Sequence, residues 1–491
     1  MAGSIALLPS LISGLDGSSG AAVHMASPAP MDAQRNRSKT GDIYAAYIHG
    51  AHFEDLPSEV REKAKDLILD SVGCALGATQ TREGQQTIDF GKSLPGKPES
   101  SIIGGGSRVS QEKCALVNTQ LANLLDFDDV FDLYSPAHPG CLIIPPALAV
   151  GEAIHASGRD VLTAIVLGYE IDMRIGRALG SILWLTGFSV ITELAAPAVV
   201  TARLLGLDTA SIERTLGLLT ADAGSLQLTH TKYDIPPELD LGTMKSNYGQ
   251  YSELGILAAY KAKNGLTSMK GLLDQDLTGW YLAGLLPEGF DELVRGLNQE
   301  YCILKMSFKP TPSCRWTHVP ITAAWQALGN RPVRPADVER IVVKGVKRLE
   351  RYQWDEMIQA QFSIPCALAL AITGATPSPG WYTSGRFSDP DIRALASRIK
   401  LERDPAAEAR EIWDLGITCT VEITLKNGES KTGYCEHVKG APGNPLTREE
   451  LLSKFKANAS HVKAPRQREI VERILGLEEM ADIAELMTLL A

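Results

Sequence analysis

Apolar residues recur at helical spacing in the first structured stretch of the chain. Pro57 and Glu59 stand just before and within the first turn of this stretch, as is typical of a helix start. Charged residues fall between the apolar ones, so the pattern predicts an amphipathic helix. The apolar stripe consists of Val60, Ala64, Leu67, Ile68 and Val72.

Small residues dominate three later stretches, 147–156, 164–176 and 195–207. Because small side chains let helices approach closely, these stretches predict the interior of an all-α domain. A further helix is predicted over 251–264, with Gly265 as its C-cap.

The periodicity changes after about residue 300. Residues 338–346 are rich in β-branched side chains, and apolar and polar residues alternate from 417 to 425. Asn427-Gly428 follows, which is a strong hairpin signal. A return to helix is predicted from about residue 442 to the end of the chain.

We therefore predict a mainly α protein with an α+β second domain. Its 491 residues exceed one ordinary core, which favours two domains. Residues 1–40 are rich in Ser, Gly, Ala and Pro and are expected to be a disordered N-terminal segment. Residues 41–300 are expected to form a helical domain and 301–440 a smaller α+β domain. Residues 441–491 are expected to be C-terminal helices that return to the helical domain.

Composition narrows the functional classes. The net charge of −10 argues against a nucleic-acid partner, and no apolar run is long enough to span a membrane. None of the eight cysteines forms a Cys-x-x-Cys pair, so common zinc and iron–sulfur spacings are absent. They suit reduced, buried cysteines of a cytoplasmic protein. Basic residues near position 37 leave a mitochondrial location as the alternative.

A cluster of four carboxylates lies within seven residues and is followed by a histidine in a Pro-Ala-His-Pro-Gly turn. Neighbouring charges can move pKa values toward the working pH, so such a cluster suits proton transfer. A solvated acidic loop with a surface histidine is the alternative. The acidic residues are Asp126, Asp128, Asp129 and Asp132, and the histidine is His138.

Three other segments carry candidate chemistry. Lys245 stands just before a predicted helix, where a lysine opposes the helix dipole; an ordinary exposed lysine is the alternative. The proline-stiffened segment 308–318 holds three basic residues that suit carboxylate recognition, unless it is only a charged linker. The hydroxyl-rich segment 181–192, which includes Ser189, reads by itself as core and loop.

Together these segments resemble the MmgE/PrpD family, which includes 2-methylcitrate dehydratase, cis-aconitate decarboxylase and iminodisuccinate epimerase. The resemblance covers roughly residues 42–485. It rests on several ordered motifs: Leu-Asp-Phe-Asp-Asp with His-Pro-Gly, Gly-Thr-Met-Lys, Lys-Pro-x-x-x-Cys-x-x-x-His, and Gly-Ala-Pro-Gly-Asn-Pro-Leu-Thr with Lys454-Phe455.

The resemblance implies a helical domain with a smaller α+β lid, a site in the cleft between them, and usually a homodimer. It also implies lyase or isomerase chemistry on small polycarboxylates, with no cofactor and no metal. Asp126 and His138 match the family's active-site aspartate and histidine, Lys245 and Lys309 its two lysines, and His318 its lid histidine.

Three positions depart from the decarboxylases of the family. Ser189 and the pair Asn247-Tyr248 stand where those enzymes carry histidines, and Val130 replaces a small polar residue. We therefore expect a lyase that dehydrates a citrate-, alkylcitrate- or aconitate-like acid. Decarboxylation of a cis-aconitate-like acid, epimerisation of a dicarboxylate such as iminodisuccinate, an Mg²⁺ enzyme that uses the four clustered acids, and an inactive binding scaffold stay open.

In this mechanism His138 transfers protons, oriented by Asp126 or Asp129, and Tyr248 is the second acid–base group. Basic residues bind the carboxylates of the substrate. The expected catalytic residues are His138, Asp126, Lys245 and Tyr248, and the expected substrate-binding residues are Lys309, Arg315, His318, Asp129 and Ser189.

Overall fold

The computed structural model describes residues 40–132, 138–179, 190–222, 246–268, 271, 273, 289–345, 349–405 and 418–491. Apart from Thr40, the expected disordered segment 1–40 lies outside the described residues. The predicted amphipathic helix is confirmed as α2 (Ser58–Ala78), which follows α1 (Thr40–Gly50). Pro57 is its N-cap, and each residue of the apolar stripe is at most 1% exposed.

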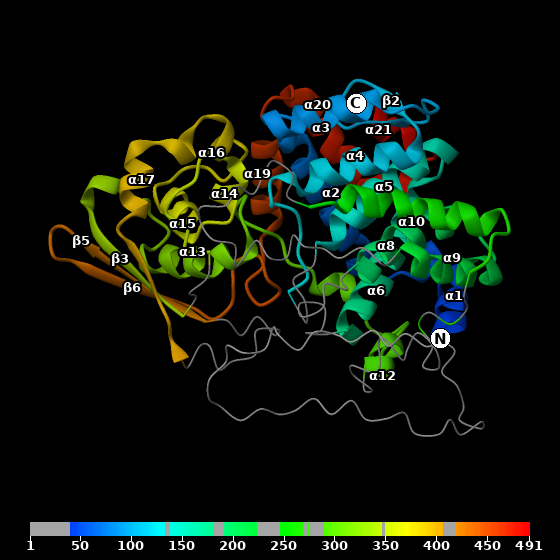
Figure 1. Cartoon of the computed structure of the whole chain (residues 1–491), viewed down its shortest axis with the longest axis horizontal. Coiled ribbons are helices and arrows are strands. Elements are labelled where there is room, and N and C mark those ends of the chain that lie inside the picture. The colour runs from blue at the N-terminus through cyan, green and yellow to red at the C-terminus, as the bar shows by residue number, and fades with distance from the viewer. Residues whose placement is uncertain are drawn as a thin grey trace, which may run out of the picture. The chain divides into compact units, whose positions relative to one another are not determined.

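Helices built from small residues form the helical part of the protein (Figure 1). Glycines let them pack closely: a Cβ on Gly255 would lie 2.5 Å from Pro197 Cγ, and one on Gly168 would lie 2.8 Å from Val200 Cγ2. The prediction of a closely packed helical interior is therefore confirmed. These helices are α4 (Gln111–Leu124), α5 (Pro139–Ile154), α6 (Gly158–Leu179), α8 (Val190–Leu204), α9 (Thr209–Asp222) and α10 (Tyr248–Lys263).

The later part of the chain contains a four-stranded mixed sheet in the order β4-β3-β5-β6. Strand β3 (Val338–Lys344) runs parallel to β4 (Ile399–Glu402) and antiparallel to β5 (Cys419–Leu425). The predicted hairpin is confirmed: β5 pairs with β6 (Ser430–Cys435) across a turn in which Gly428 has a φ of 87°. Helix α13 (Arg315–Ala327) packs on β5 and β6, and α15 (Ile364–Ile372) packs on α13.

The chain ends in three helices that contact the first part of the protein. Helix α19 (Arg448–Asn458) begins with a capping box between Thr447 and Glu450 and packs on α2. Helix α20 (Ala464–Leu475) also contacts α2, and α21 (Ala484–Leu490) contacts α5. The fold is thus a large helical part with a smaller α+β part, as the sequence predicts. In the described part of the chain, every helix is too short or too polar to cross a membrane.

A β-bridge joins the acidic loop to the segment before α13. The backbones of Val130 and Ser307 exchange two N–H···O bonds of 3.0 Å. The bridge places the acidic loop, residues 125–132, beside residues 306–309.

The remaining elements are α3 (Arg82–Ser93), β1 (Ser100–Ser101), β2 (Arg108–Val109), α12 (Gly289–Val294), α14 (Met357–Gln361), α16 (Gly380–Thr383), α17 (Pro390–Ala396) and the 3-10 turns η1 (Phe53–Asp55), η3 (Cys302–Lys305), η4 (Pro335–Asp337), η5 (Arg386–Ser388) and η7 (Leu477–Glu479).

Candidate active site

Asp126 is the second residue of the acidic loop and has a left-handed backbone conformation, with a φ of 51°. Among residues other than glycine, aspartate is one of those that tolerate this region best. Lys309 holds the residue at two points, because its Nζ donates to Asp126 Oδ1 at 2.5 Å and to the Asp126 carbonyl oxygen at 3.0 Å. Both side chains are buried, so the ion pair shields each charge from an otherwise costly environment.

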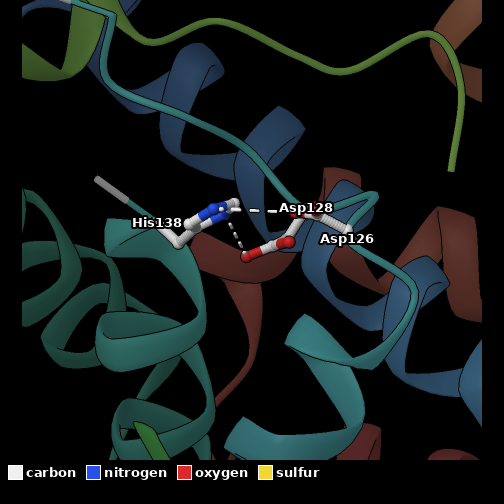
Figure 2. A group of neighbouring side chains, drawn as sticks. All are labelled: Asp126, Asp128 and His138. Carbon is white, nitrogen blue, oxygen red and sulfur yellow. Dashed lines mark ion pairs between the residues drawn. The ribbon is translucent and has the colours of Figure 1, made fainter. Parts of the chain in front are cut away.

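His138 lies between two carboxylates. It is the N-cap of α5, and Pro139 stiffens the first helical position. Its Nδ1 lies 3.2 Å from Asp128 Oδ2, and its Nε2 lies 3.6 Å from Asp126 Oδ1 (Figure 2). The imidazole is 13% exposed while the two carboxylates are almost fully buried. One edge of the histidine is therefore accessible, while its partners are fixed behind it.

Asp128 is a partner of His138 that the sequence did not indicate. Asn123 Nδ2 donates to its Oδ2 at 3.0 Å and so helps to fix it. Asp129, the expected orienter, instead accepts a hydrogen bond of 2.9 Å from Tyr169. No periodic signal marks Asp128, because the backbone turns at Asp126 and the loop is not an extended strand.

Tyr248 is the first residue of α10, and its ring centroid lies 6.1 Å from that of His138. The start of α10 is anchored because Ser246 Oγ donates to Asn123 Oδ1 at 3.0 Å. Asn123 thus connects the helix that carries Tyr248 with Asp128. Two other expected site residues, Lys245 and Ser189, lie outside the described residues.

Arg315 has a protein carboxylate as its partner. Its Nε and Nη2 donate to the two oxygens of Asp132 at 2.9 and 2.5 Å, and Ser307 Oγ donates to the same carboxylate at 2.5 Å. Such a two-pronged arginine–carboxylate pair is among the strongest charged contacts. Arg315 therefore joins α13 to the end of the acidic loop. Its expected contact with substrate stays a prediction.

His318 lies one turn after Arg315 and is fully buried. Burial, followed by the charges of Arg315 and Lys309, holds the pKa of His318 well below its usual range. The imidazole is therefore neutral. Its Nε2 lies 3.2 Å from the Thr311 carbonyl oxygen, to which it donates, and its Nδ1 can accept from Arg315 Nη1 at 3.4 Å. His318 thus supports Arg315 in this structure.

The positions of the four clustered acids show whether they could bind one metal ion together. They do not converge on one point: Asp129 and Asp132 have the separate partners described above, while Asp126, Asp128 and His138 bring ligand atoms within 4.8 Å of one another. Two carboxylates and an imidazole suit a divalent metal. However, Lys309 already binds the oxygen of Asp126 that faces His138, so a cation there would compete with the lysine.

Two further carboxyl groups lie buried in the helical part of the protein, Asp172 of α6 and Glu193 of α8. Burial, and then the charge of Asp129, raises the pKa of Asp172 well above its usual range. Burial, and then the charge of Asp172, likewise raises the pKa of Glu193 well above its usual range. Both groups therefore keep their proton to a higher pH in the folded protein than in the unfolded chain.

We predict that Asp172→Asn makes the free energy of unfolding less dependent on pH. The folded protein keeps a proton at Asp172 that the unfolded chain releases above about pH 4, so stability falls as pH rises from there, by at most about 1.4 kcal/mol per pH unit for one proton. Urea unfolding at pH 5, 6.5 and 8 measures the slope. The control is Asp355→Asn, an exposed carboxyl, which should leave it unchanged. Equal slopes for wild type and Asp172→Asn would contradict the prediction.

Comparison with known proteins agrees with this architecture. The MmgE/PrpD N-terminal domain matches residues 42–291, and the MmgE/PrpD C-terminal domain matches residues 311–477. Cis-aconitate decarboxylase from Aspergillus terreus is 26% identical over 89% of this chain and 93% of the relative. The enzymes of that name from mouse and human are 26% and 25% identical, over 91% of this chain and 93% and 94% of the relatives. Both family domains occur in order along one chain, and the relatives span nearly its whole length, so this protein belongs to the MmgE/PrpD family.

Proposed function

We propose that this protein is a lyase that acts on a small polycarboxylate by acid–base proton transfer at His138, without a cofactor. One observation carries the proposal: a partly accessible imidazole lies between two buried carboxylates, one of which is held by a buried lysine. The relatives named cis-aconitate decarboxylase support a substrate with several carboxylates.

The arrangement favours His138 as a proton donor. Two carboxylates next to an imidazole stabilise its protonated, cationic form. Decarboxylation of an unsaturated polycarboxylate needs one such donor. The carbon–carbon bond to a carboxylate breaks, its electrons shift along the adjacent double bond, and the carbon at the far end takes the proton from His138. CO₂ leaves, and water returns a proton to the imidazole. We therefore place decarboxylation first.

Dehydration is the second candidate, and the position of Tyr248 favours it. Dehydration needs a base that removes a proton next to a carboxylate and an acid that protonates the departing hydroxyl group. His138 and Tyr248 are two proton-transfer groups with ring centroids 6.1 Å apart, close enough to act on one small molecule. This was the reaction favoured from the sequence.

Lys309 contributes positive charge at this site. An ammonium group has three donors, and two of those on Lys309 are bound to Asp126. The lysine side chain is fully buried, so its charge acts on the site through Asp126. We propose that Lys245, which matches one of the two lysines of the family, and Ser189 complete the binding of substrate. A homodimer and a cytoplasmic location are further proposals. All eight cysteines are buried and none forms a disulfide bond, which suits a reducing compartment.

The proposed function is tested by incubation of the protein with citrate, 2-methylcitrate, longer alkylcitrates, cis-aconitate and iminodisuccinate. NMR in ²H₂O distinguishes loss of CO₂, loss of water, and proton exchange with inversion. We expect CO₂ loss or water loss from one of the tricarboxylates, and undiminished activity after EDTA treatment. Inversion alone would support an epimerase, EDTA-sensitive activity would support a metal enzyme, and no reaction with any acid of the panel would contradict the lyase.

A further inference from the structure

Three segments meet directly behind His138. Asp129 follows Asp128 in the acidic loop, Gly140 lies two residues after His138 at the start of α5, and Tyr169 belongs to α6. The hydroxyl group of Tyr169 donates to Asp129 Oδ2 at 2.9 Å. A Cβ placed on Gly140 would lie 2.0 Å from Asp129 Oδ1 and 2.8 Å from the Tyr169 hydroxyl oxygen. The Asp129 carboxyl group thus fills the space between the start of α5 and the side chain of Tyr169.

This contact links the two segments that carry the proton-transfer pair. Asp128 Oδ2 lies 3.2 Å from His138 Nδ1, and Asp129, the next residue after Asp128, contacts Gly140, two residues after His138. Asp129 and Tyr169 are both buried, so water cannot replace either group. A shift of the Asp129 side chain would therefore move the acidic loop relative to α5, and with it the distance between Asp128 and His138.

We propose that Asp129 and Tyr169 are positioning residues that fix His138 relative to Asp128 for proton transfer. The inference rests on the proposed function through the role of His138. It differs from the expectation that Asp129 binds substrate, because the carboxyl group is occupied by Tyr169 and by the start of α5. Proton transfer is sensitive to such placement: a displacement of about 1 Å can cost on the order of a hundredfold in rate.

The charge state of Asp129 should make the activity depend on pH. Burial, then the charges of Asp128 and Asp70, raises the pKa of Asp129 to about 8, while the Tyr169 hydrogen bond and Lys454 of α19 act in the opposite direction. Lys63 of α2 and Asp172 of α6 also interact with this carboxyl group. Asp129 is therefore neutral at pH 7. Above about pH 8 Asp129 becomes negatively charged next to Asp128. The repulsion between the two carboxylates then disturbs the placement of Asp128 relative to His138.

The first test compares Tyr169→Phe with Tyr44→Phe. Tyr44 is, like Tyr169, a buried tyrosine with a bonded hydroxyl group. Its hydroxyl group donates to the backbone carbonyl oxygen of Leu293 in α12 and not to Asp129. We expect Tyr169→Phe to lower kcat on the order of ten- to a hundredfold with little change in KM, and Tyr44→Phe to retain wild-type kcat. An equal loss in both variants would mean that the Tyr169 hydroxyl group has only a structural role and would overturn the proposal.

The second test compares Asp129→Ala with Asp129→Asn. Asparagine keeps the shape and the hydrogen-bond acceptor but cannot ionise, so it should recover most of the kcat that alanine loses. In the wild type kcat should fall above about pH 8, and this fall should be absent from Asp129→Asn. Equal activity of the two variants, or an unchanged alkaline fall in Asp129→Asn, would contradict the inference.

A third measurement needs no substrate and therefore separates this inference from the proposed function. NMR of histidine-labelled protein follows the titration of the His138 imidazole, with His138→Ala used to assign its signal. We expect Tyr169→Phe to shift the midpoint of that titration and Tyr44→Phe to leave it unchanged. If the wild type transforms none of the acids, the lyase proposal fails while this shift still tests the positioning role. No shift in Tyr169→Phe would overturn the inference.

Discussion

Replacement of His138 with alanine is expected to lower kcat on the order of 10²–10⁴-fold, the usual contribution of one acid–base group. The side chain lies at the N-terminal end of α5, and Asp126 and Asp128 keep their bonds to Lys309 and Asn123 without it. The fold should therefore persist. Steady-state kinetics on the acid that the wild type transforms, together with circular dichroism and a thermal melt, measures both effects.

The matched control for this variant is His155→Ala. His155 lies at the other end of α5, is exposed, and bonds to Asp482 at 2.7 Å. It should retain wild-type kinetics. Turnover by His138→Ala at the wild-type rate would refute the assignment of His138, and loss of the folded melt would show instead that the histidine is needed for structure.

Lys309→Met is expected to destabilise the protein by about 3–5 kcal/mol, because it leaves the buried Asp126 carboxylate without its cation. Asp126 would also lose the bond that holds its backbone carbonyl oxygen, so kcat should fall together with stability. Urea unfolding measures the stability, and steady-state kinetics measures the activity of the remaining folded protein.

The double variant Asp126→Asn/Lys309→Met shows whether Lys309→Met destabilises the protein through an unpaired buried charge or through the lost contact itself. Removal of both charges should recover much of the stability, because no unpaired ion remains. Lys400→Met is the exposed control, whose ion pair with Glu402 lies on the surface and should matter little. If the double variant is less stable than Lys309→Met, the ion pair does not explain the effect.

Periodicity predicted the elements of this fold well. The apolar stripe of α2 and the Asn-Gly turn between β5 and β6 are local signals, since each depends on residues a few positions apart. The cluster around His138 was also visible, because its acids lie within the same short loop. These features could be read from the chain because near neighbours determine them.

Partners distant in sequence could not be read in the same way. Arg315 pairs with Asp132 across 183 positions, and a one-dimensional pattern gives no reason to prefer this carboxylate over one from a substrate. Lys454 donates to the carbonyl oxygen of Phe127 at 2.6 Å and pairs with Asp70, a role that its helix alone does not indicate. Burial identifies a face of a helix, but only the packed structure shows which group lies opposite.

The bridge between Val130 and Ser307 has a consequence for the order of folding. During synthesis the acidic loop is made long before residue 307, so its backbone partner, the lysine that neutralises Asp126 and the arginine that pairs with Asp132 all arrive late. Contacts between such distant positions form slowly, because a long loop must close first. The helices can assemble early, whereas the acidic loop stays without its neutralising partners until the second half of the chain has docked. Catalytic competence is therefore among the last properties that a newly made chain acquires.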